Sequence, residues 1–527
     1  MMRSLTLAPA ALVALLLTGC QHEADQARLE PQPTAEPTTA LTSQQLDNEI
    51  WTQLRKTGSY NWNQAPANVV WSALLRSDHV LSVGYQPLGR EGAHSLPADA
   101  RLLPRWEAAR QQVLDLILAE ERKTQPDLTL EKLLVFEPNA LPVVTVRVQE
   151  LGTIRRLRAS GLVRYAEPMG YEPGSTRAAA RGTASTLSSS GCGSNTATAG
   201  LLEGADYTVL SNGSKSSWHQ ADQYHGIRSA WSQSTGSGIK LVVIDTGSSD
   251  AQENLGSPFN QGLSSGRTVE RLVTLPRNSI FGIPYGSAET PNDGCGHGTS
   301  MAGAAAAPRG TDGNAVGVAY NANLITIRAA EDVFLDASRE VQGVANAFLL
   351  AANRADVRII SMSMGRLTSS SQMTEAIRYA YGKGKLIFCA AGTSFDWSAG
   401  WVGVIYPASL TEAVAVTGVK DDLATRCDEC HVGSDVEFTV VMQRRSNNLR
   451  ALTLAQSGDA PSTVGGSSVA TASMAGMAAL VWAQYPNETR TQIMGRLVAA
   501  SSNRAARSSS FGWGRVNVAA ALGAQPL

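Results

Sequence analysis

The apolar positions of the chain change their spacing along its length, and this spacing predicts its helices and strands. Between residues 218 and 522, short runs of branched apolar residues alternate with longer segments whose apolar positions recur at helical spacing. Unbroken apolar runs are typical of parallel strands that are buried on both faces. The alternation predicts an α/β fold: a doubly wound, mostly parallel sheet that carries functional groups at the carboxyl ends of its strands. The expected strands are Ile239–Asp245, Leu324–Ile327, Val357–Ser361, Lys385–Ala390 and Ala413–Val419, and the expected helices are Gly298–Ala307, Glu340–Asn353, Thr374–Gly382, Ser467–Gln484 and Thr489–Ala500.

A smaller folded unit is expected before this sheet, over about residues 46–172. Its clearest element is an amphipathic helix at Pro104–Lys123, which has proline at its start. Two strand-like runs, a basic helix and a last strand follow, so the unit is predicted to be a small α+β domain. These later elements are expected at Leu133–Phe136, Val143–Val148, Thr153–Ala159 and Leu162–Ala166.

Residues 1–19 read as a secretory signal. Arg3 gives a positive start, and the apolar run Leu5–Leu17 is too short to span a bilayer. The run ends in Leu-Thr-Gly before Cys20, which resembles a bacterial lipoprotein signal and implies that Cys20 becomes the lipidated N-terminus. An ordinary signal peptide and a chance small-residue site with Cys are the alternatives. Gln21, where an inner-membrane retention signal would show Asp, favours the outer membrane of the bacterial cell envelope as the site of the anchor.

Two further segments are too polar to build a core. Residues 20–45 are rich in Pro, Thr, Ala, Gln and Glu and are expected to be a flexible tether. Residues 173–217 are expected to be a linker, because residues 174–200 are almost wholly small and polar. The peptidase-like pattern described below then occupies residues 218–527.

The charge balance limits the class of partner. The chain has 44 Lys and Arg against 45 Asp and Glu, a net charge of −1, so no nucleic-acid partner is expected. Hydrophobic residues make up 43% and charged residues 17%, which is a globular composition. Six cysteines in 527 residues are too few for a disulfide scaffold.

Three polar residues stand at chemically suggestive places in the predicted α/β pattern. Asp245 ends a buried strand, where a carboxylate can orient an imidazole. His297 lies among glycines at the head of a small-residue helix, and no second His follows three to five residues away, so a metal site is not expected. Ser468 lies at the start of another helix, where free N–H groups favour negative charge. Taken singly, each has a commoner explanation: a turn Asp, a helix-terminal His and an N-cap Ser.

Together the three residues occur in the order Asp, His, Ser, and the sequence around them resembles the subtilisin-like serine peptidases, or subtilases. The specific matches are Val-Ile-Asp-Thr-Gly at 243–247, Gly-His-Gly-Thr at 296–299 and Gly-Ser-Ser at 466–468. Weaker matches lie at 361–365, 406–408 and 512–517. The resemblance covers about residues 218–522 and implies a subtilisin-like fold that hydrolyses peptide bonds through an acyl-enzyme. Ser468 would attack, His297 would act as base and then acid, and Asp245 would orient the imidazole.

The resemblance also implies a substrate cleft and a propeptide. A protein or peptide substrate would lie between two strand-end segments, and the chain's own N-terminal unit would inhibit the enzyme until it is cut away. Val163–Pro168 is similar to the last strand of a subtilase propeptide, and self-cleavage is expected between about residues 172 and 217. The implied cleft residues are Ser363, Met364 and Gly365 on one side and Ala390, Ala391 and Gly392 on the other.

The chain departs from the family pattern at the oxyanion site. Where subtilases have Asn, this chain has Thr393, whose shorter hydroxyl would share the oxyanion with the Ser468 N–H. Ala472 and Ser473 replace Pro and His after the nucleophile. The departure at Thr393 leaves open a pseudopeptidase, a binding module on a subtilase scaffold. A different serine hydrolase, such as an esterase, is the other alternative, although the Gly-x-Ser-x-Gly elbow is absent around Ser468.

The remaining cysteines raise separate questions. Cys427, Cys430 and His431 match the haem-attachment pattern C-x-x-C-H, but a local disulfide or surface loop is the preferred interpretation. Cys389 lies in an apolar strand and is the expected free buried thiol, and Cys192 is a candidate partner for Cys295. No cofactor and no metal site are predicted. Calcium is left open, since no run has the spacing of a calcium loop.

Overall fold

The computed structural model describes residues 38–90, 96–97, 99–174, 192–193, 195–280, 283–393 and 402–526. These residues belong to one compact unit. The expected signal at 1–19, the lipidation site Cys20 and most of the tether at 20–45 lie outside the described residues, as does the 175–191 part of the expected linker. Within the unit we distinguish an N-terminal lobe, residues 38–174, from a C-terminal lobe, residues 192–526.

The N-terminal lobe is a small α+β structure. Its antiparallel sheet has the order β2-β1-β3, and Val83 of β1 pairs with Val144 of β2 and Ala166 of β3. Helices cover the sheet and bury an apolar core around Trp62 and Trp106. The elements are α1 (Ser43–Thr57), η1 (Trp62–Gln64), α2 (Ala67–Leu75), β1 (Val80–Tyr85), η2 (Ala100–Leu102), α3 (Pro104–Glu121), α4 (Leu130–Leu133), β2 (Val143–Arg147), α5 (Leu151–Ala159) and β3 (Val163–Pro168).

One expected strand of this lobe is wrong. Leu133–Phe136 is not a strand, because the chain forms the short helix α4 up to Leu133 and then makes a single bridge from Leu134 to Val146. The hydroxyl of Thr129 accepts the backbone N–H of Lys132 and caps this helix. A run of four apolar residues does not distinguish a strand from a buried helix end, and here the capping residue decides.

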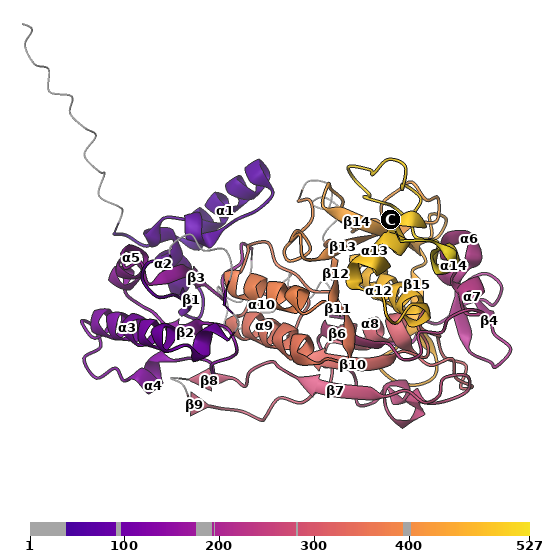
Figure 1. Cartoon of the computed structure of the whole chain (residues 1–527), viewed down its shortest axis with the longest axis horizontal. Coiled ribbons are helices and arrows are strands. Elements are labelled where there is room, and N and C mark those ends of the chain that lie inside the picture. The colour runs from indigo at the N-terminus through magenta and orange to yellow at the C-terminus, as the bar shows by residue number, and fades with distance from the viewer. Residues whose placement is uncertain are drawn as a thin grey trace, which may run out of the picture. The chain divides into compact units, whose positions relative to one another are not determined.

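The C-terminal lobe is built on a parallel sheet of seven strands in the order β14-β13-β12-β11-β6-β10-β7 (Figure 1). The expected doubly wound α/β fold is therefore confirmed. All five expected strands are present, and the two edge strands β7 and β14 were not anticipated. The strands are β6 (Lys240–Asp245), β7 (Val269–Val273), β10 (Asn323–Arg328), β11 (Val357–Met362), β12 (Leu386–Ala390), β13 (Val414–Lys420) and β14 (Val436–Gln443).

Alternate residues of the central strand β6 enter two different cores, one on each face of the sheet. Leu241 and Val243 pack with α8 and α12, whereas Val242 and Ile244 pack with α9 and α10. Figure 1 shows the two helix layers on either side of the strands. The helices of this lobe are α6 (Asp222–His225), α7 (Ile227–Ala230), α8 (His297–Ala306), α9 (Ser338–Asn353), α10 (Ser371–Gly382), α12 (Gly466–Gln484), α13 (Arg490–Ala499) and α14 (Val518–Gly523), with short 3₁₀ turns η3 (Trp218–Gln220), η4 (Glu253–Leu255) and η5 (Ser257–Phe259).

Residues 195–217, which precede the expected start of the domain, already pack on the C-terminal lobe. The strands β4 (Tyr207–Val209) and β5 (Lys215–Ser217) form a hairpin, and the Thr198 hydroxyl bonds that of Thr463 at 3.0 Å. Two more small hairpins pair β8 (Ser279–Ile280) with β9 (Ile283–Pro284) and β15 (Ala451–Leu454) with β16 (Pro461–Val464).

Helix α12 has the length and hydropathy of a membrane-spanning helix, and it alone does so among the described residues. Most of it is buried within the lobe, between α8 and the sheet. Its apolar composition is therefore explained by its place in the core.

Candidate active site

Asp245 and His297 meet at the carboxyl end of the sheet. Asp245 is the last residue of β6 and fully buried, and His297 is the first residue of α8. The Oδ1 atom of Asp245 accepts a hydrogen bond from His297 Nδ1 at 2.7 Å. Gly298 lets the helix approach this closely, since a Cβ there would lie 2.3 Å from the Gly247 carbonyl oxygen. The arrangement fixes the ring so that its Nε2 atom faces away from Asp245.

Asp293, which the sequence analysis did not single out, holds the start of α8. Its Oδ1 accepts the backbone N–H groups of Cys295 at 3.0 Å and Gly296 at 2.7 Å. Its Oδ2 accepts the N–H and the hydroxyl of Thr299 at 2.8 and 2.7 Å. Asp293 therefore satisfies the free donors at the helix start and sets the position of the His297 backbone. The sequence does contain a signal for this role, because Asp293 and Thr299 lie six residues apart on either side of the Gly-rich start of the helix.

The charges around His297 favour its protonated form. Burial of the ring lowers its pKa, but the charge and hydrogen bond of Asp245 and the charges of Asp293 and Asp332 oppose this, and the net result is a raised pKa. A base in this setting binds a proton more readily than a free imidazole. It is also stabilised as the imidazolium once it has taken a proton.

Ser468 lies in the first turn of α12, which packs against α8. It is 9% exposed, and its carbonyl oxygen accepts the Ser363 hydroxyl at 3.0 Å. Among the described residues, the Ser468 hydroxyl has no hydrogen-bond partner. Within the same residues, the His297 side chain bonds only Asp245. The Ser468–His297 contact is thus open in this structure, as is common where a hydrogen bond tightens only when substrate is bound.

Thr393 is exposed, and its hydroxyl is already engaged by the residue before Ser468. Thr393 Oγ1 accepts the backbone N–H of Ser467 at 3.0 Å, and the two hydroxyl oxygens lie 2.9 Å apart. Ser467 Oγ in turn accepts the Gly392 N–H at 3.1 Å. Gly466 must lack a side chain, since a Cβ there would lie 2.6 Å from Thr393 Oγ1. Ser467 is a second residue that the sequence analysis missed.

The two expected cleft segments follow neighbouring strands and both reach the start of α12. Ser363 comes directly after β11 and contacts Ser468. Gly392 comes shortly after β12 and contacts Ser467. Gly392 has φ +128°, and a Cβ there would lie 2.6 Å from the His431 ring. The side chains of Met364, Ala390 and Ala391 are buried, while Gly365 bonds through its backbone to Val333 and Leu335.

The cysteine predictions are confirmed. Cys192 is disulfide-bonded to Cys295, so this part of the expected linker is tied to the chain two residues before His297. Cys427 and Cys430 form a local disulfide, and their sulfurs are therefore not thiols that could attach a haem. Cys389 is free and buried, and burial raises the pKa of its thiol to about 12.

Three acidic side chains gather away from these residues. Glu253, Asp312 and Asp459 each place one carboxylate oxygen within 4.8 Å of the others. The Asp459 carboxyl raises the pKa of Glu253, and Asp312 accepts side-chain amides of Asn254 and Gln261. Exposed acidic groups of this kind are common without an ion, and calcium stays an expectation.

Residues 236–514, more than half of the chain, match the Subtilase family, Peptidase_S8. The chain belongs to the subtilase family. It is 30% identical over 295 residues to a subtilisin of Bacillus sp. strain TA39, covering 52% of this chain and 64% of that protein. It is 29% identical over 193 residues to thermitase of Thermoactinomyces vulgaris, covering 37% of this chain and 59% of that protein. The matched segments thus span less than two thirds of either relative.

A solved structure resembles this subtilase over most of its fold. Fervidolysin of Fervidobacterium pennivorans, described as a keratinolytic enzyme related to subtilisin, superposes with a TM-score of 0.54 at 16% identity. The superposition covers 85% of this chain and 61% of fervidolysin. At this identity the likeness concerns the fold, and the subtilase family is carried by the sequence match over residues 236–514.

Proposed function

We propose that this subtilase is a serine endopeptidase that hydrolyses peptide bonds through an acyl-enzyme. The observation that carries the proposal is the 2.7 Å hydrogen bond between Asp245 and His297, at the head of a helix that packs against α12. Ser468, in the first turn of α12, is the proposed nucleophile. Family membership supports the same assignment.

In the proposed reaction, His297 takes the hydroxyl proton of Ser468 as Ser468 attacks the substrate carbonyl carbon. The imidazolium that forms is stabilised by Asp245 and then gives its proton to the leaving amine. Water repeats the sequence on the acyl-enzyme and releases the second product. The surrounding carboxylates outweigh the effect of burial and favour the charged state of His297, which is the state that forms during the attack.

The proposed oxyanion donors are the backbone N–H of Ser468 and the hydroxyl of Thr393. Because Ser467 Oγ accepts the Gly392 N–H, its own proton can point to Thr393 Oγ1 at 2.9 Å. Thr393 Oγ1 then accepts both the N–H and the hydroxyl proton of Ser467, and the hydroxyl proton of Thr393 stays available for the substrate oxyanion. A chain of such hydrogen bonds strengthens its last donor.

A serine-directed probe tests the proposal. A fluorophosphonate should label the wild type at Ser468, which mass spectrometry of the labelled peptide can locate, and should not label Ser468→Ala. Ser473→Ala is the matched control, because Ser473 lies on the same helix and its buried hydroxyl has no partner among the described residues. Labelling that persists in Ser468→Ala would overturn the assignment.

A pseudopeptidase is the second candidate, and the engagement of Thr393 by the Ser467 N–H is the observation that favours it. If Ser467 accepts the Thr393 proton, no side-chain donor is left for the oxyanion. A wild-type chain that folds but neither reacts with the probe nor cuts a peptide would select this function.

We propose further that the protein is made as a zymogen. The N-terminal lobe would act as intramolecular inhibitor, and the chain would cut itself in the linker between about residues 172 and 217. Contacts between the lobes support this: Glu167 accepts the N–H of Ser371 at the start of α10 at 2.7 Å, and Ser82 bonds Gln372 at 2.8 Å. Equal full-length mass for wild type and Ser468→Ala would contradict self-processing.

The expected lipid anchor is also part of the proposal. Cys20, after the signal at residues 1–19, would carry the acyl chains and hold the precursor at the bacterial outer membrane. Growth with a labelled fatty acid should label the wild type and leave Cys20→Ser unlabelled. Membrane fractionation would then identify which membrane holds the labelled protein.

A further inference from the structure

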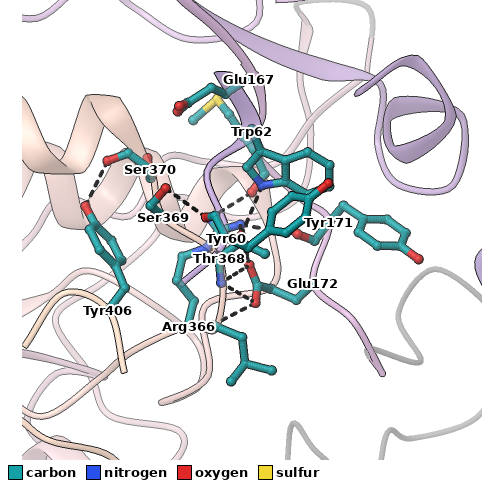
Figure 2. Close-up of polar contacts among 12 residues, drawn as sticks. Tyr60, Trp62, Glu167, Tyr171, Glu172, Arg366, Thr368, Ser369, Ser370 and Tyr406 are labelled. Atoms are coloured by element: carbon teal, nitrogen blue, oxygen red, sulfur yellow. Dashed lines mark hydrogen bonds and ion pairs between the residues drawn. The ribbon is translucent and has the colours of Figure 1, made fainter. Parts of the chain in front are cut away.

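Arg366 is a fully buried arginine next to the segment Ser363–Gly365. Its guanidinium donates from Nη1 to the Met169 carbonyl at 3.0 Å and from Nη2 to the Tyr171 carbonyl at 3.3 Å. Its Nε donates to Glu172 Oε1 at 2.8 Å. Figure 2 shows Arg366, Glu172 and Thr368 linked in one group of polar contacts. Nearly all partners of this guanidinium thus come from residues 169–172 of the N-terminal lobe.

The carboxylate of Glu172 is held as completely as the guanidinium. Its Oε2 accepts the backbone N–H groups of Leu367 at 2.8 Å and Thr368 at 3.2 Å, and Thr368 also donates its hydroxyl to Oε1. The ion pair with Arg366 Nη2 has an N–O distance of 2.7 Å, and both side chains are at most 1% exposed. The C-terminal lobe therefore offers one carboxylate a guanidinium, two N–H groups and a hydroxyl.

On its own lobe, the guanidinium of Arg366 has a side-chain partner in Thr368, at 3.1 Å. When the N-terminal lobe leaves, Arg366 loses an ion pair and two carbonyl partners at once. A buried charge without its partner is costly, and a fresh carboxylate in the same place removes that cost. The site thus fits the carboxylate of a peptide side chain, and Glu172 is its occupant in this structure.

The site lies on a path that leads to Ser468. Arg366 is three residues from Ser363, whose hydroxyl donates to the Ser468 carbonyl. The occupying segment runs from Glu172 to Gly174 and enters the linker, and the next described residue, Cys192, is disulfide-bonded beside His297. A peptide bound like residues 169–174 would therefore place its acidic residue upstream of the bond that is cut.

We infer that Arg366, with the N–H groups of Leu367 and Thr368, forms a carboxylate-binding subsite that selects peptides with a glutamate upstream of the scissile bond. The inference rests on the proposed endopeptidase function and names a substrate class for it. The same subsite holds Glu172 in the precursor, so one recognition serves both the inhibitor and the substrate.

Matched peptides test the subsite on the wild-type enzyme after processing. Quenched fluorescent peptides copy residues 169–190 and carry Glu, Gln or Lys at the position of Glu172, and mass spectrometry locates the cut. We expect kcat/KM to be at least about tenfold higher for Glu than for Gln, because the bond is to a charged group, and lowest for Lys. Equal rates for Glu and Gln at the same cut would overturn the inference while leaving the peptidase proposal intact.

Variants assign the preference to Arg366. Arg366→Gln should bring the Glu-to-Gln ratio close to one, and Arg366→Glu should reverse the order of the Glu and Lys peptides. Arg378→Gln is the control, because Arg378 is exposed and pairs with Glu412 at 2.9 Å on the lobe surface. If the Arg366 variants do not fold, the wild-type peptide series alone decides.

A binding measurement separates this inference from the proposed chemistry. If the wild type cuts no peptide, fluorescence anisotropy of the labelled Glu and Gln peptides is measured on full-length Ser468→Ala/Glu172→Gln. In that chain Arg366 lacks its own carboxylate. At least about tenfold tighter binding of the Glu peptide supports the subsite without catalysis, whereas equal binding of the two peptides overturns it.

Discussion

Asp245 holds His297 through one carboxylate oxygen. Oδ1 accepts the imidazole Nδ1–H at 2.7 Å and the Thr246 N–H at 2.8 Å, while the buried Oδ2 has no hydrogen-bond partner among the described residues. The negative charge of Asp245 is thus directed largely at the ring. This relationship makes the protonation of His297 the property that most depends on Asp245.

The acid limb of the pH–activity profile should follow the deprotonation of His297. The base must be neutral to accept a proton, so kcat/KM should rise as pH rises through the raised pKa of His297. Asp245→Asn removes the charge that raises this pKa, so the limb should move to lower pH while the maximal rate falls by roughly 10⁴-fold. A pH series of peptide hydrolysis measures both effects, and an unmoved limb would separate Asp245 from His297.

Thr393→Val should lower kcat by up to about 10²–10³-fold, because it removes the proposed side-chain donor to the oxyanion. Ser467→Ala should lower kcat less, since it removes only the group that orients Thr393. KM should change little in either variant, because the donor acts mainly on the transition state.

Thr411→Val is the control for these two variants, because the exposed Thr411 side chain bonds only Glu412 within the described part of the chain. Steady-state kinetics on one peptide substrate compares the set. Full activity in Thr393→Val would remove Thr393 from the oxyanion site.

Asp293→Ala should destabilise the fold by at least about 2 kcal/mol, because it leaves buried N–H groups at the start of α8 unpaired. Urea unfolding of the Ser468→Ala background gives the free energy without self-digestion. Asp250→Ala, which breaks the exposed pair of Asp250 with Arg271, should change it by no more than about 1 kcal/mol. Similar small losses in both variants would contradict the role of Asp293.

Cys389 should resist alkylation in the folded protein. Its thiol is buried and its pKa is raised to about 12, so almost no thiolate is present at neutral pH. Iodoacetamide should modify Cys389 only after denaturation, as peptide mass mapping can show. Rapid modification of the native protein would indicate that β12 opens readily.

The sequence predicts those features that depend on residues close together along the chain. Strand-end Asp245 and helix-start His297 are visible as motifs, and the central strands of the sheet are visible as apolar runs. The edge strand β7 was not predicted because all its residues are only half-buried and the adjacent charges of Glu270 and Arg271 interrupt its apolar run. The contact between Glu172 and Arg366 was not predicted for another reason. The two residues are 194 positions apart, and no spacing rule links a carboxylate to a guanidinium across two lobes.

Both disulfides of the described residues lie within the C-terminal lobe. A cut between residues 174 and 192 would therefore leave no disulfide of the described residues between the two parts. Everything N-terminal of the cut, including an acylated Cys20, would stay with the inhibitor at the membrane while the catalytic lobe is released. The Cys192–Cys295 disulfide would hold the new amino terminus close to His297. Activation would then release the enzyme from the membrane, with a short segment of the linker still attached to it.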